Sequence, residues 1–204
     1  MISDREPGYL GRLPHHDHDR AEAVLQALGL RPTAWHDTDL LAAFTLRAGA
    51  ISIGAYPGAT ILCGYPALSG CVEDAQRPFL QRILSVAGEA TTLVFEVAGG
   101  VNYFAYALYV NAQRMRALAG DAARGVAISE GDLQPEEIAV LGPSERTGVK
   151  QLRVAAGEGL TFAMAGRFLG TPFDRFPAES LEMEFVSLYG PGLLRRAIGR
   201  LPWF

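Results

Sequence analysis

The sequence predicts an α+β fold, with a mixed, largely antiparallel sheet and helices packed on one or both of its faces. Expected strands, recognised by apolar residues that alternate with polar ones, outnumber expected helices. Most of these strands are separated by short turn sequences, so they pair as hairpins. Of the 204 residues, 49% are hydrophobic, which is enough to bury one sizeable core. We therefore expect residues 1–204 to form a single α+β domain, with a division near residues 120–148 as the alternative.

Composition and charge exclude several classes of function. Eighteen basic and 22 acidic residues leave a net charge of −4, so no nucleic-acid partner is expected. No apolar run approaches the ~18 residues that a membrane-spanning helix needs, so no integral membrane association is expected. The amino-terminal residues lack the apolar segment of a secretory signal, and the two cysteines make no disulfide framework. Together these features predict a cytoplasmic protein.

The amino-terminal part combines turn residues with one helix. Proline and glycine interrupt residues 1–18, which predicts an irregular amino-terminal arm. A helix is expected to begin at Asp19, whose side chain would cap it with Glu22 as the capping-box partner. Residues 32–39 are expected to connect this helix to a strand at 40–47.

The rest of the chain alternates hairpins with helices. A Tyr-Pro-Gly turn divides residues 50–64 into two paired strands, and a helix follows from Pro78 to Gly88. Strand 91–98 precedes Tyr103–Val110, which is apolar on both faces, as in a central strand covered from both sides. The remaining expected elements are a tight turn at Asn111-Ala112, a strand at 113–119, a loop-rich region at 120–148 with a short strand at 126–129 and a helix start at Pro135, a strand at 149–154, a helix through 160–168, a strand at 181–185 and a carboxy-terminal amphipathic helix at 190–204.

Three of the four histidines lie close together near the amino terminus, in the sequence His15-His16-Asp17-His18. Imidazoles and carboxylates at this spacing can bind zinc or nickel, so His15, His16 and His18 are the candidate ligands of a metal-dependent hydrolase. A catalytic zinc normally takes its ligands from separated elements, however, whereas these residues lie in the expected arm. Adventitious metal binding and a solvated approach to the following helix are the alternatives.

A second candidate site lies on the hairpin after residue 100. Arg114 and Arg116 are two residues apart on an expected strand, so their side chains would share one face and could hold a carboxylate or phosphate. The alternative is that both guanidinium groups pair with acidic neighbours such as Asp121 or Glu130. The expected binding residues for a small anionic ligand are Asn102, Tyr103, Arg114, Arg116 and Asp121.

Common catalytic and cofactor-binding motifs are missing from the sequence. The segment from Gly142 to Gly148 places five residues between its glycines instead of four, so it does not fit a phosphate-binding loop. Neither a dinucleotide-binding glycine pattern nor a serine nucleophile elbow occurs. We therefore predict no catalytic residue and no cofactor. The carboxy-terminal helix is expected to dock on its own sheet, on a protein partner or on a second copy of the chain.

Three motifs between Ile51 and Glu137 occur together. A Pro-Gly turn leads into a strand that reaches Cys63, an aromatic strand begins at Asn102, and a loop ends in Pro-Glu-Glu at Glu137. In these motifs the chain resembles a group of uncharacterised bacterial proteins that form a domain of unknown function. It departs from that group at Ala98-Gly99-Gly100-Val101, where the others tend to have a histidine, and at Ala112, where they have a turn glycine. The resemblance implies no activity and no cofactor.

We therefore expect a non-enzymatic binding or protein-interaction module of bacterial origin that acts in the cytosol. Its partner would be a protein or a second copy of the chain. A metal-dependent hydrolase that uses the amino-terminal histidines and a small anionic-ligand binding protein are the alternatives.

Overall fold

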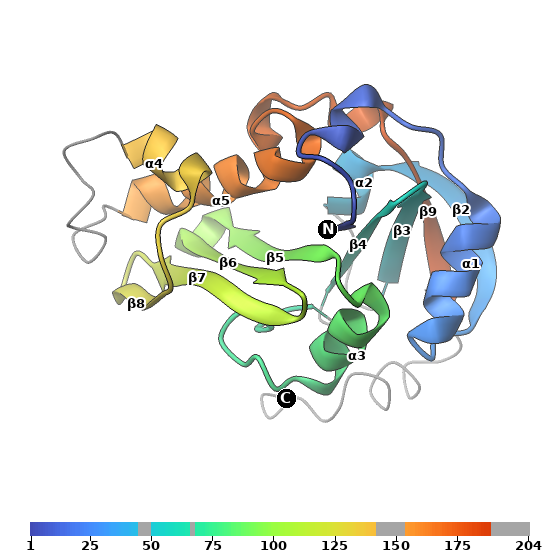
Figure 1. Ribbon diagram of the computed structural model, residues 1–204, viewed down its shortest axis with the longest axis horizontal. Helices are drawn as coiled ribbons and strands as arrows, with labels where there is room; N and C mark the ends of the chain where they lie inside the picture. The colour runs from blue at the N-terminus through green and yellow to red at the C-terminus, as the bar shows by residue number, and fades with distance from the viewer. Residues whose placement is uncertain (45–49, 66–67, 142–153, 189–204) are drawn as a thin grey trace.

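The computed structural model describes residues 1–44, 50–65, 68–141 and 154–188, and it is built around one nine-stranded antiparallel sheet (Figure 1). Along the sheet the strands follow the order β2-β9-β3-β4-β1-β5-β6-β7-β8. The strands are β1 (Ile2–Ser3), β2 (Pro32–Asp39), β3 (Ala50–Tyr56), β4 (Ala59–Tyr65), β5 (Thr91–Ala98), β6 (Tyr103–Val110), β7 (Gln113–Asp121), β8 (Gly125–Glu130) and β9 (Glu182–Leu188). The helices are α1 (His18–Ala27), α2 (Leu40–Phe44), α3 (Pro78–Ala87), α4 (Pro135–Leu141) and α5 (Val154–Leu169).

The expected α+β fold is confirmed. Every strand pairing among the described residues is antiparallel, so the sheet has no parallel pair there and is not mixed. Helices cover both faces (Figure 1). Buried residues of α1 and α3 pack on one face, while those of α2 and α5 pack on the other. Each face therefore has its own apolar core.

The hairpins and the longer helices lie at the positions predicted from the sequence. Strands β3 and β4 pair through the predicted turn, and β6 lies between β5 and β7 with both faces buried. The tight turn between β6 and β7 has positive φ at both central residues, 51° at Asn111 and 58° at Ala112. Two positive φ values match the twist of a two-residue hairpin. Alanine adopts this conformation at a cost, because its Cβ approaches the backbone there.

The amino-terminal arm is more ordered than the sequence predicts. Ile2 and Ser3 form β1 in the middle of the sheet, and Tyr9–Arg12 form a 3₁₀ helix that buries Leu10. A two-residue strand is too short to show an alternation of polar and apolar residues. Its position in the sheet depends on strands that lie far along the chain. The irregular part of the arm is therefore confined to short connections.

Three local predictions near α1 and α2 are wrong. The cap of α1 is Asp17, which accepts the backbone N–H of Arg20, and not Asp19. Residues 32–39 form strand β2, and not a connector; β2 lies at the edge of the sheet, where exposed positions replace the apolar alternation. The segment that begins at Leu40 forms the short helix α2, and not a strand, with Asp39 accepting the N–H of Ala42 at its start.

Some predicted elements lie outside the described residues. These are most of the strand expected at 149–154 and the amphipathic helix expected at 190–204; Val154 itself begins α5. None of the helices within the described ranges is both long and apolar enough to cross a bilayer.

Candidate functional site

Strand β1 is a short wedge between two longer strands. Ile2 pairs with Thr60 of β4 on one side and with Thr92 of β5 on the other, both antiparallel. Met1 adds two backbone hydrogen bonds to Leu93, each of 2.7 Å. Because β1 is so short, the facing edges of β4 and β5 lack a strand between them farther along, and the two strands run in different directions there (Figure 1).

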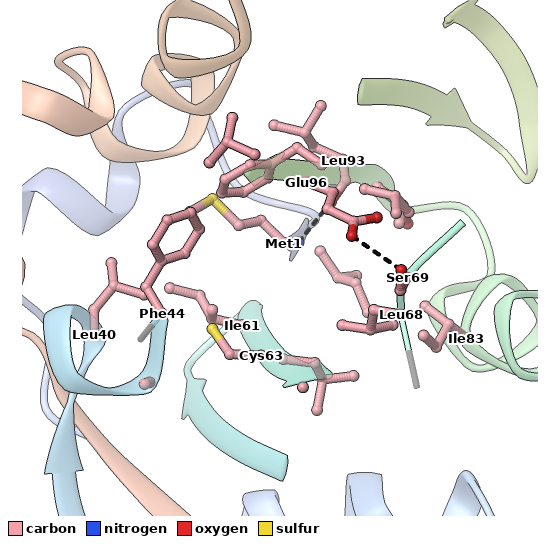
Figure 2. Close-up of a pocket in the computed structure, with 18 of the residues that line it drawn as sticks. Met1, Leu40, Phe44, Ile61, Cys63, Leu68, Ser69, Ile83, Leu93 and Glu96 are labelled. Atoms are coloured by element: carbon pink, nitrogen blue, oxygen red, sulfur yellow. Dashed lines mark hydrogen bonds between the residues drawn. The ribbon is translucent and has the colours of Figure 1, made fainter. Parts of the chain in front are cut away.

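A cavity of about 310 Å³ fills the space between these diverging strands. We call this cavity the β4–β5 slot. Figure 2 shows Leu40 and Phe44 at one side of it, Ile61 and Cys63 on β4, and Leu68, Ser69 and Ile83 at the opposite side. Its lining residues are Met1, Ile2, Leu40, Ala43, Phe44, Ile61, Leu62, Cys63, Gly64, Leu68, Ser69, Ile83 and residues 92–98. The lining is thus largely aliphatic, with one aromatic residue on each of α2 and β5.

Glu96 supplies the charged group of the slot. Its carboxylate accepts a hydrogen bond from the Ser69 hydroxyl at 2.9 Å (Figure 2) and another from the Gly70 backbone N–H at 3.1 Å. Burial raises the pKa of Glu96 above its ordinary value, although these two hydrogen bonds act in the opposite direction. A carboxylate is therefore held in place, by hydrogen bonds, beside a mostly apolar cavity.

Thr92 lies beside the same cavity, but its hydroxyl does not open into it. The residue borders the slot and is only 1% exposed, and its hydroxyl is buried without a hydrogen-bond partner among the described residues. A buried hydroxyl without a partner costs free energy, and most such groups in proteins are paired.

Cys63 also lines the slot, but its thiol is unsuited to nucleophilic chemistry. Burial raises the pKa of Cys63 to about 11, so the thiol stays protonated at neutral pH. The thiolate is the reactive form of cysteine. Cys63 therefore acts in the slot as a small, weakly polar surface.

The amino-terminal histidines contact two glutamates of β9 and do not converge on one metal-binding position. His16 Nε2 lies 2.7 Å from Glu184, and His18 Nδ1 lies 2.8 Å from the same carboxylate. His15 is almost fully exposed and lies 3.7 Å from Glu182. Among the described residues, no group of three or more potential ligands is arranged to hold a metal ion.

Hydrogen bonds fix the protonation pattern of this cluster. The backbone N–H of Ala55 donates to His16 Nδ1 at 3.1 Å, so Nε2 carries the proton that His16 donates to Glu184. The hydrogen bond to Glu184 raises the pKa of His18. The cluster thus fastens the arm and the start of α1 to β9.

Arg114 and Arg116 do not form the expected pair, because a β-bulge separates them. Arg116 lies opposite Leu108, whereas Arg114 lies opposite the adjacent Tyr109, so the residue between the two arginines is extra. The extra residue reverses the alternation, and the two side chains reach different faces. Arg114 donates to the Val72 carbonyl at 3.0 Å and also forms an ion pair with Glu130, the alternative that the sequence left open.

Arg116 is buried in a network of its own. Its guanidinium lies 2.8 Å from Glu137 of α4, and both side chains are at most 1% exposed. The Tyr106 hydroxyl donates a hydrogen bond to the same carboxylate, and the backbone N–H of Gln134 donates another at 2.7 Å. The network joins α4 to strands β6 and β7 and leaves Arg116 no free donor pair for an anion.

The other three predicted site residues lie away from Arg114. Asn102 is an exposed turn residue with φ of 47°, and Tyr103 donates its hydroxyl to Glu73. Asp121 accepts the backbone N–H groups of Ala123 and Arg124 and so closes the β7–β8 turn. Tyr103 and Tyr109, next to Arg114, are six residues apart on β6, which is about 20 Å. Tyr103 and Asp121 lie together at one end of the β6–β7 pair, directly beyond Phe104 and Gly120, with Asn102 next to Tyr103, whereas Arg114 and Arg116 lie farther along β7.

The slot residues were missed because their proximity depends on β1. Nothing in Met1–Ser3 marks a strand, and nothing near Cys63 or Glu96 predicts that β4 and β5 flank a third strand. One signal was readable: a glutamate in an apolar strand is rarely buried without a purpose or a partner.

Comparison with known proteins gives one match. A family model described as a family of unknown function (DUF6928) matches residues 1–140. The matched range contains every described residue that lines the slot, and also Arg116 and Glu137. It confirms the resemblance to an uncharacterised domain family. No curated protein and no solved structure shows a significant match to the chain.

Proposed function

Since the chain belongs to DUF6928, a family of unknown function, we propose a function from its geometry: it is a non-enzymatic binding protein that holds a small, largely apolar molecule in the β4–β5 slot. The observation that carries this proposal is the separation of β4 and β5 by only two residues of β1. A sheet that closed fully would bury these apolar edges against each other. Here the fold maintains a cavity instead.

The size and the lining of the slot indicate the size and polarity of the ligand. Binding sites for small molecules are usually about 300–1,000 Å³ and mostly apolar, with a few placed polar groups. The slot, at about 310 Å³, lies at the lower end of this range. A compact molecule of a few carbon atoms therefore fits better than a nucleotide or a folded peptide.

Binding is favoured over catalysis by the chemistry of the polar side chains. Cys63 stays protonated, and Glu96 has neither a histidine nor a second carboxylate beside it among the described residues that line the slot. General acid–base catalysis needs a positioned proton donor or acceptor next to the reacting group, usually with a partner. The slot supplies a contact surface and one carboxylate.

An anionic ligand is disfavoured at this place. Glu96 is the charged side chain among the described lining residues, and it would repel a carboxylate or phosphate. The net charge of −4 also disfavours a nucleic-acid partner. Cys63 and Cys71 are not joined in a disulfide, which favours a reducing compartment and thus a cytoplasmic location.

Ligand-observed NMR tests the proposed function with hexanol, a neutral probe small enough for the slot. We expect saturation transfer from the protein to hexanol, with a dissociation constant in the millimolar range or tighter. In the Cys63→Phe variant the larger side chain fills the slot, so the transfer is lost. Val86→Phe, on the exposed side of α3 outside the slot, is the matched control and keeps it. Absence of transfer in the unaltered protein, or equal transfer in both variants, refutes the proposed function.

A further inference from the structure

The Glu96 carboxylate marks one side of the slot. Thr92, Val94 and Glu96 occupy alternate positions of β5, so their side chains point to the same side of the sheet. Since the Thr92 hydroxyl is buried and does not open into the cavity, Glu96 is the polar group that this face of β5 presents to the slot.

The Glu96 carboxylate has bonding capacity left. Ser69 donates to one of its oxygens and Gly70 to the other, whereas each oxygen of a carboxylate can accept two hydrogen bonds. Within the described part of the chain, no lysine, arginine or histidine forms an ion pair with it. A half-buried carboxylate without a cation is uncommon, because burial disfavours an unpaired charge.

The neighbouring charges do not replace such a cation. Arg77 and Glu73 both act on Glu96 through space, and their effects on its pKa are opposite in sign. Glu73 is itself bonded to the Tyr103 hydroxyl. The carboxylate is thus positioned by two hydrogen bonds, borders an apolar cavity and forms no ion pair within the described residues, although Arg77 acts on it through space.

From this arrangement we propose that the slot selects a small primary amine, with its apolar body between β4 and β5 and its ammonium group on Glu96. The inference rests on the proposed function of the slot and adds the chemical class of the ligand. An ammonium group offers three hydrogen-bond donors and a positive charge, so it can fill the remaining acceptor positions of the carboxylate and balance its charge. An alcohol of the same length fills the slot without the charge, and a carboxylic acid brings a second negative charge.

Calorimetric titration with hexylamine, hexanol and hexanoate tests this assignment at neutral pH. The three probes share one alkyl chain and differ in the end group. We expect hexylamine to bind about tenfold more tightly than hexanol, because hydrogen bonds to charged groups are stronger than neutral ones. Hexanoate should bind most weakly. Glu96→Gln should lower the affinity for hexylamine about tenfold and leave that for hexanol unchanged.

Glu73→Gln is the matched control, because it removes a nearby carboxylate that does not line the slot. It should retain the preference for hexylamine. Equal affinity for all three probes overturns the amine assignment and leaves the proposed function standing, and tighter binding of hexanoate does the same. If no probe binds, the proposed function fails and the amine assignment with it. The comparison of probes on the unaltered protein decides the question even if Glu96→Gln does not fold.

Discussion

The buried ion pair between Arg116 and Glu137 gives the sharpest prediction about stability. Replacing Glu137 with glutamine keeps the size of the side chain but removes its charge. Arg116 then stays buried at about 1% exposure without a counter-charge. Breaking a buried pair by removing one partner typically costs about 3–5 kcal/mol. We expect Glu137→Gln to lower the free energy of unfolding by that amount, which is a large part of the ~5–15 kcal/mol of a typical domain.

The adjacent residue supplies a matched control. Glu136 lies in the same first turn of α4 and forms an ion pair of 2.8 Å with Arg167, but both side chains are partly exposed. Glu136→Gln therefore removes the same charge from the same helix end, but from a partly exposed pair that lacks the bonds of Glu137 to Tyr106 and Gln134. Since exposed pairs contribute about 0–1 kcal/mol, its effect should be small.

Urea unfolding followed by circular dichroism measures both variants. If Glu137→Gln does not fold, the double variant Arg116→Met with Glu137→Leu provides the second measurement, because removing both charges leaves no unpaired ion. It should be more stable than Glu137→Gln. Equal costs below about 1 kcal/mol for Glu136→Gln and Glu137→Gln would refute the reasoning, since burial would then make no difference.

Three further predictions concern other positions. Thr92→Val removes the unsatisfied hydroxyl and should stabilise the ligand-free protein by about 1 kcal/mol in urea unfolding; a loss of stability would show that the hydroxyl is satisfied. Ala112→Gly relieves positive φ in the β6–β7 turn and should also raise stability by about 1 kcal/mol, whereas a lower melting temperature would contradict this turn geometry. Because its partner Glu184 raises the pKa of His18, the contribution of this contact is complete below ~pH 6.5 and is lost as the pH rises through the higher folded-state value. The stability difference between the unaltered protein and His18→Gln should therefore be larger at ~pH 6 than at ~pH 8.5, and a difference independent of pH would exclude the contact.

Most of the elements could be predicted from the sequence because local patterns determine the hairpins and the longer helices. The β3–β4 and β5–β6–β7 hairpins depend on turns a few residues long, and the apolar stripe of α3 follows Pro78 directly. Edge strand β2 escaped prediction because half-exposed strands lack a clear alternation. Helix α2 escaped because five apolar residues fit a buried strand as well as a helix.

The candidate site was harder to predict, because its parts meet only through long-range pairing. Arg114 and Arg116 follow the alternation rule in the sequence, and one extra residue in the β-bulge breaks it. The slot depends on β1, which pairs with strands about 60 and 90 residues away. No local pattern encodes such a three-strand arrangement.

Titration of methyl-labelled protein with hexanol, followed by NMR, tests most directly whether the β4–β5 slot holds a small apolar molecule. We predict that the perturbed methyl signals belong to Leu40, Ile61, Leu68 and Ile83, which surround the slot on different elements. Methyl signals that do not move at saturating hexanol, or that move only at surface positions such as Val140, would contradict the account.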